Sequence, residues 1–138
     1  MTRVFWDTNL FIYLFEGGPF GPDVRRLRER MLSRADVLVT SALTLGELQV
    51  LPLRTSASEA ERALEAVRRV ATIVPFDEQA SRRYAAIRQD RAIKPADAIQ
   101  LACAAAAGVD LFITNDDRLS SRNVPGVKFI TSLERAFL

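Results

Sequence analysis

Short apolar segments alternate with helical segments along this chain, and that alternation constrains the fold more than any other feature. Two of the apolar segments, residues 37–39 and 111–113, contain only Val, Leu, Phe and Ile. Uninterrupted apolar strands are typical of a parallel sheet that helices cover on both faces. Strands that alternate with helices favour the same architecture. The pattern therefore predicts an α/β fold.

Hydrophobic periodicity, capping residues and turn residues give the expected elements. The expected strands are residues 4–6, 37–40, 72–74, 111–114 and 127–130. The expected helices are residues 10–15, 24–33, 42–51, 58–70, 77–90, 95–107 and 132–137. The length of 138 residues, without a repeat or linker, predicts a single domain spanning 1–138.

The sequence gives no sign of a membrane segment. No uncharged apolar run approaches the roughly 18 residues that cross a bilayer. Asp7 interrupts the first apolar segment before a signal-peptide core could form. We therefore expect a cytoplasmic protein. The single cysteine, Cys103, excludes an internal disulfide and, in its apolar run, predicts a small buried side chain.

The chain contains no histidine, which excludes several kinds of catalysis. A Ser-His-Asp triad, a Cys-His dyad, a His-ligated zinc and an imidazole-dependent ribonuclease are all impossible. A hydrolase with this composition must use carboxylates and a hard cation. Arginine provides 17 of the 19 basic residues, which suits phosphate recognition, although a G- and C-rich genome gives the same bias.

Acidic residues follow two of the expected strands. Asp7 comes directly after the first strand, and Asp116 and Asp117 come just after the fourth. Ligands of open parallel sheets bind beyond the carboxyl ends of strands, where the strand order reverses. These acids therefore form a candidate site if the two strands are neighbours, which spacing alone does not decide.

Two further acids lie in apolar helical segments. Asp97 precedes an alanine-rich run, and Glu47 lies between Leu45 and Leu48. A buried carboxylate is costly unless it is paired or bound to a metal. The alternatives are that Asp97 complements the helix dipole and that Glu47 is simply exposed. If all four acids converge, they repel one another and need a cation such as magnesium, which prefers oxygen ligands.

The motifs occur in the order found in a known family. They are Asp7-Thr8-Asn9 after the first strand, Glu47 in a helix, Asp97-Ala98 opening an alanine-rich helix, and Thr114-Asn115-Asp116 after the fourth strand. The chain, from Val4 to Phe137, resembles the PIN-domain nucleases, and within them the VapC-type toxins of bacterial toxin–antitoxin pairs. The resemblance implies a three-layer α/β/α fold around a mostly parallel five-stranded sheet, with the first and fourth strands as neighbours.

The resemblance also implies roles for the acids. It implies that Asp7 and Asp97 bind Mg²⁺ directly, with Mn²⁺ as an alternative ion. Glu47 and Asp116 would complete the metal site, directly or through water. The resemblance implies two orienting side chains, Asn9 and Thr114. Asp117 is either a fifth acid or the cap of the segment that follows it.

The implied activity is metal-assisted hydrolysis of an RNA phosphodiester by a toxin that a partner antitoxin inhibits. Homodimers are common among such toxins. An aromatic-rich segment supplies both core residues and a surface for the antitoxin or for a second copy; its apolar members are Phe11, Tyr13, Leu14, Phe15 and Phe20.

Other functions fit the sequence less well. A phosphoacceptor receiver domain shares the expected sheet and its acids, but it needs a second acid beside Asp7, where Thr8 stands. An aspartyl-nucleophile phosphatase needs an acid where Asn9 stands, and the glycines at 17–21 match no nucleotide-binding loop. A PIN fold that binds RNA without cutting it is the remaining alternative.

Overall fold

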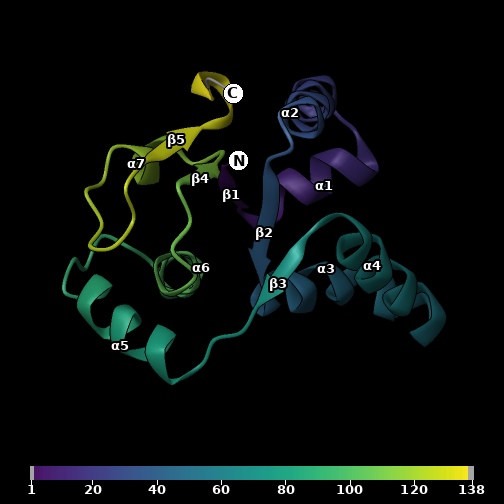
Figure 1. Ribbon diagram of the computed structural model, residues 1–138. Helices are drawn as coiled ribbons and strands as arrows, with labels where there is room; N and C mark the ends of the chain where they lie inside the picture. The colour runs from purple at the N-terminus through teal and green to yellow at the C-terminus, as the bar shows by residue number, and fades with distance from the viewer. Residues whose placement is uncertain (1, 137–138) are drawn as a thin grey trace.

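The computed structural model describes residues 2–136 (Figure 1). All four strand pairings are parallel, in the order β3-β2-β1-β4-β5. The strands are β1 (Arg3–Trp6), β2 (Val37–Ser41), β3 (Thr72–Val74), β4 (Leu111–Thr114) and β5 (Ile130–Ser132). The helices are α1 (Thr8–Glu16), α2 (Gly21–Ser33), α3 (Ala42–Thr55), α4 (Ala57–Val70), α5 (Glu78–Ile87), α6 (Pro95–Ala106), α7 (Asp117–Ser120) and the 3₁₀ turn η1 (Leu133–Arg135).

Helices cover both faces of the sheet, and the predicted three-layer α/β/α fold is confirmed (Figure 1). Successive side chains of a strand point to opposite faces. Phe5 accordingly packs in a core cluster with residues of α5 and α6, and its ring stacks on Phe112. Val4 and Trp6 pack in a second cluster with residues of α1, α2 and α4. The sheet is therefore buried on both sides.

The strand order reverses at β1, which lies between β2 and β4. Trp6 pairs in register with Ile113, so the carboxyl ends of β1 and β4 lie side by side. The adjacency that the family resemblance implied is thus confirmed. The loops that follow these two strands are brought to the position where ligands bind in open parallel sheets.

Two elements near the carboxyl terminus differ from prediction. The fifth strand is Ile130–Ser132, not 127–130, because Val127 is buried from a turn while Phe129 is 62% exposed. The expected helix 132–137 is only η1 within the described residues, since Ser132 still belongs to β5 and Ala136 is extended. Residue 137 lies outside the described range.

Strands β3 and β4 have the predicted limits, and the remaining element boundaries shift by a few residues. Helix α3 continues beyond the expected end through Pro52, which lies in its last turns, to Thr55. Cys103 is buried, as predicted. Among residues 2–136, no helix combines the length and apolar character needed to cross a membrane.

Candidate active site

Asp7 lies between β1 and α1 and caps that helix. Its Oδ1 accepts a hydrogen bond from the Thr8 backbone N–H at 2.8 Å, and its Oδ2 accepts one from the Thr114 hydroxyl at 3.1 Å. Burial raises the pKa of Asp7 to about 6, against the effect of these two hydrogen bonds, and the charges of Asp97 and Glu47 raise it further. Thr114, which was expected to orient an acid, thus forms a hydrogen bond with Asp7.

Asp116 follows β4 and caps the short helix α7. Its Oδ1 accepts from the Arg118 backbone N–H at 2.9 Å, and its own N–H donates to the Thr114 hydroxyl at 3.1 Å. The capping role considered for Asp117 is thus wrong, because Asp116 precedes the helix and Asp117 begins it. Asp117 is exposed and lines a different recess, together with Phe20.

Asp97 lies in the first turn of α6 and is partly buried. Burial raises its pKa, and so do the charges of Asp116 and Glu47, whereas Lys94 and Arg118 lower it. Among the described residues, no hydrogen-bond donor meets its carboxylate. Its position fits the helix-dipole role as well, and it lines one recess with Asp7 and Glu47 and another with Asp116.

Glu47 is exposed on α3 and forms a hydrogen bond with a residue of α1. Its Oε1 accepts a hydrogen bond from the Thr8 hydroxyl at 2.6 Å. It lines one recess with Asp7 and Asp97, and its charge acts on both of them. Asn9 lines the same recess, but it is exposed, and within residues 2–136 no hydrogen bond joins it to an acid.

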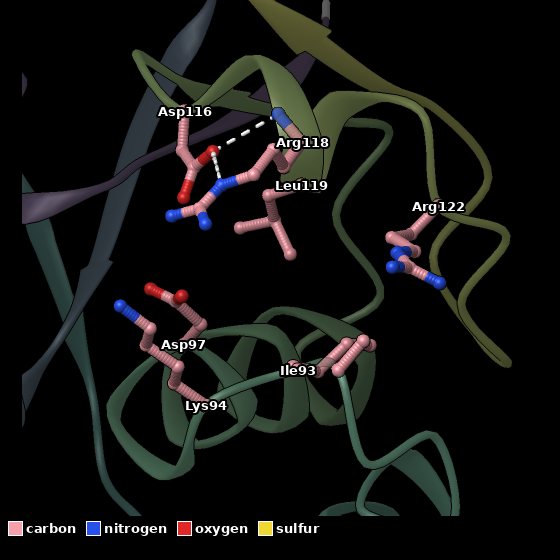
Figure 2. Close-up of a pocket in the computed structure, with 8 residues that line it drawn as sticks. Ile93, Lys94, Asp97, Asp116, Arg118, Leu119 and Arg122 are labelled. Carbon is pink, nitrogen blue, oxygen red and sulfur yellow. Dashed lines mark hydrogen bonds and ion pairs between the residues drawn. The ribbon is translucent and has the colours of Figure 1, made fainter.

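Asp97 lines two separate recesses. One recess also contains Asp7 and Glu47, and the other contains Asp116 (Figure 2). Among the described residues, no group of three or more acidic side chains is arranged to bind a metal ion. The candidate metal ligands are nevertheless all carboxylate oxygens, and burial, with a smaller contribution from neighbouring acids, raises the pKa values of Asp7 and Asp97. This chemistry fits a hard divalent cation.

A buried polar network beneath the acids was not predicted. The Gln100 amide donates to the hydroxyls of Thr8 and Thr44, at 3.1 and 2.8 Å, and accepts from the Ser41 hydroxyl. Gln100 is 2% exposed. The signal was present in the sequence: Gln100 interrupts an apolar helix one turn after Asp97, on the same face.

Fold and site together define an α/β domain with an acidic cluster at the strand-order reversal of a parallel sheet. The PIN-domain family profile matches residues 4–124, and the chain belongs to the PIN-domain family. The predicted resemblance to PIN-domain proteins of the VapC type is confirmed, and the receiver alternative loses its basis. No curated protein matches the sequence.

Solved structures of similar fold come from VapBC and other toxin–antitoxin complexes. A chain of VapBC2 from Rickettsia felis, bound to a promoter DNA fragment, is 16% identical with a TM-score of 0.75, covering 94% of this chain and 98% of that one. A chain of DNA-bound VapBC from Salmonella typhimurium is 25% identical with a TM-score of 0.71, covering 96% and 99%. A chain of a toxin–antitoxin complex from Klebsiella pneumoniae is 25% identical with a TM-score of 0.67, covering 90% and 94%.

Proposed function

We propose that this chain is a magnesium-dependent ribonuclease that acts as the toxin of a toxin–antitoxin pair. The observation that carries the proposal is that Asp7, Glu47 and Asp97, which come from distant segments of the chain, line one recess at the reversal of strand order. Membership of the PIN-domain family supports the nuclease class. The similarity to chains of toxin–antitoxin complexes supports the biological role.

In this proposal Asp7, Asp97 and Asp116 hold the Mg²⁺ ion, or Mn²⁺ in its place. Glu47 completes the site, directly or through water. A bound ion supplies a water of lowered pKa and neutralises charge on the phosphate oxygens. Thr114 keeps the Asp7 carboxylate in one orientation, and Asp116 accepts the proton of the attacking water.

The proposed partners are RNA, an antitoxin protein and a second copy of the chain. In the aromatic-rich segment, Phe11 is buried, whereas Phe15 and Phe20 are 45% and 41% exposed. Helix α3 also exposes a group of apolar side chains, Val50, Leu51 and Leu53. Exposed apolar groups of this kind suit protein–protein contacts in a cytoplasmic complex. Co-expression with the product of the neighbouring gene, followed by mass measurement in solution, tests both contacts.

Cleavage of total RNA, with Mg²⁺ present or chelated and with mapping of the new ends, tests the activity. We expect cleavage only with Mg²⁺, loss of cleavage in Asp97→Asn, and full cleavage in Glu78→Gln, which changes an exposed acid on α5. Cleavage that persists in the chelator or in Asp97→Asn would refute the proposal. RNA binding without cleavage by the wild-type chain would support a non-catalytic PIN fold instead.

A further inference from the structure

Of the two recesses that Asp97 lines, the one that also contains Asp116 is lined by three basic side chains (Figure 2). Lys94 precedes α6, Arg118 belongs to α7, and Arg122 follows α7. The cations thus come from two segments of the chain and line one recess beside the candidate active site. The other recess, which Asp7 and Glu47 line, contains no basic side chain among its described lining residues.

The two arginines retain capacity for a ligand. Arg118 Nε lies 3.6 Å from Asp116 Oδ1, and Arg122 Nη1 lies 3.3 Å from Asp90 Oδ2. The arginine side chains are 79% and 41% exposed, and ion pairs this exposed are weak. A guanidinium group has five N–H donors, so most of them stay available after one such contact. Arginine donors match the geometry of phosphate oxygens.

The floor of this recess is apolar. Ile93 and Leu119 are 3% and 4% exposed, and both lie between Arg122 and the other labelled charged side chains (Figure 2). An apolar floor with cations at the rim combines a surface for a sugar or base with donors for a phosphate. This chemistry corresponds to a nucleotide unit of a nucleic-acid strand.

We propose that this recess binds the RNA backbone next to the phosphate that is cut, with Lys94, Arg118 and Arg122 as its cationic contacts. The inference rests on the proposed ribonuclease function and deepens it. Because Asp97 lines both recesses, a strand whose scissile phosphate lies at the acids passes directly into the basic recess.

Fluorescence anisotropy of a labelled single-stranded RNA, titrated with the full-length protein in chelator at several salt concentrations, tests this subsite without cleavage. Each contact to a single strand contributes about 0.7 to the slope of log K against log salt concentration. We expect Lys94→Gln, Arg118→Gln and Arg122→Gln each to weaken binding several-fold and to reduce that slope by about 0.7. The matched control is Arg62→Gln, an ion-paired arginine of α4 that is 73% exposed.

The outcomes separate the subsite from the ribonuclease function. A reduced slope in the three variants, with the slope unchanged in Arg62→Gln, supports the subsite. An unchanged slope in the three variants, or an equal reduction in Arg62→Gln, overturns the subsite even if the wild-type chain cleaves RNA. If the wild-type chain neither binds nor cleaves RNA, the proposed function fails and the subsite fails with it.

Discussion

The Thr114 hydroxyl donates a hydrogen bond to Asp7 Oδ2 at 3.1 Å and thereby joins side chains that are 107 residues apart in sequence. The Thr114 hydroxyl oxygen also accepts a hydrogen bond from the Asp116 backbone N–H at 3.1 Å. One hydroxyl at the end of β4 thus orients an acid that follows β1 and the loop that carries a second acid. This contact links the candidate acids that follow two neighbouring strands.

Replacing Thr114 by valine should shift the pH dependence of RNA cleavage. The lost hydrogen bond stabilises the ionised form of Asp7, so the pKa of Asp7 should rise above its value of about 6. The loss of a hydrogen bond to a charged group raises a pKa by about one unit, so we expect the cleavage rate at pH 7 to fall about twofold and to recover at higher pH. Thr114→Ser keeps the hydroxyl and should retain the wild-type profile. Identical pH profiles for the valine variant and the wild type would contradict this role.

Asp7→Asn should stabilise the metal-free protein in a pH-dependent way. Burial raises the pKa of Asp7 from 3.8 to about 6, so between these values the folded state binds more protons than the unfolded state. The free energy of unfolding of the wild type therefore falls as the pH rises from 3.8 to about 6, and Asp7 changes it no further at higher pH. Relative to wild type, we expect the variant to gain on the order of 2 kcal/mol between pH 4 and pH 7.

Urea denaturation in chelator at a series of pH values measures this difference. Asp23→Asn changes an exposed, ion-paired acid of α2 and serves as the control. The expected gain should be absent from that control. A difference between Asp7→Asn and wild type that stays constant from pH 4 to pH 7 would show that Asp7 is not a destabilising buried charge.

Most of the fold was predictable because the sheet consists of short, strongly apolar strands separated by capped helices. Residues 111–114 form a strand with the predicted limits, and Pro95 begins a helix as predicted. The fifth strand was misplaced because Val127 and Phe129 give the apolar pattern of a strand. In the structure Phe129 is exposed, whereas Val127 is buried but directly follows a turn. Tertiary packing, not local periodicity, decides such short segments.

The candidate site was only partly predictable. Asp7 and Asp116 were identifiable because each follows a strand, but their adjacency depends on strand order, which the sequence does not encode locally. The supporting contacts were missed because they join distant segments: Thr8 bonds to Glu47, and Gln100 bonds to Thr44. A polar residue in an apolar helix is a usable signal, but its partners become evident only in the folded chain.

Gln100→Leu should destabilise the protein. The substitution leaves the buried Ser41 hydroxyl without its acceptor and removes donors to Thr8 and Thr44. We expect a loss of about 2 kcal/mol in the free energy of unfolding, because an unsatisfied buried polar group is costly. Gln79→Leu, at an exposed position on α5, should change that free energy by less than about 0.5 kcal/mol. Equal unfolding free energies for the two variants, measured by chemical denaturation, would rule out a structural network.

Titration of Mn²⁺, followed by the paramagnetic resonance signal of the free ion, tests most directly whether the acids form one cation site. We expect the wild-type chain to remove Mn²⁺ from solution in a saturable manner and Glu78→Gln to behave in the same way. Asp7→Asn and Asp97→Asn should each bind Mn²⁺ at least about tenfold more weakly, since each loses a charged ligand. Wild-type Mn²⁺ affinity in both of these variants would contradict a shared metal site.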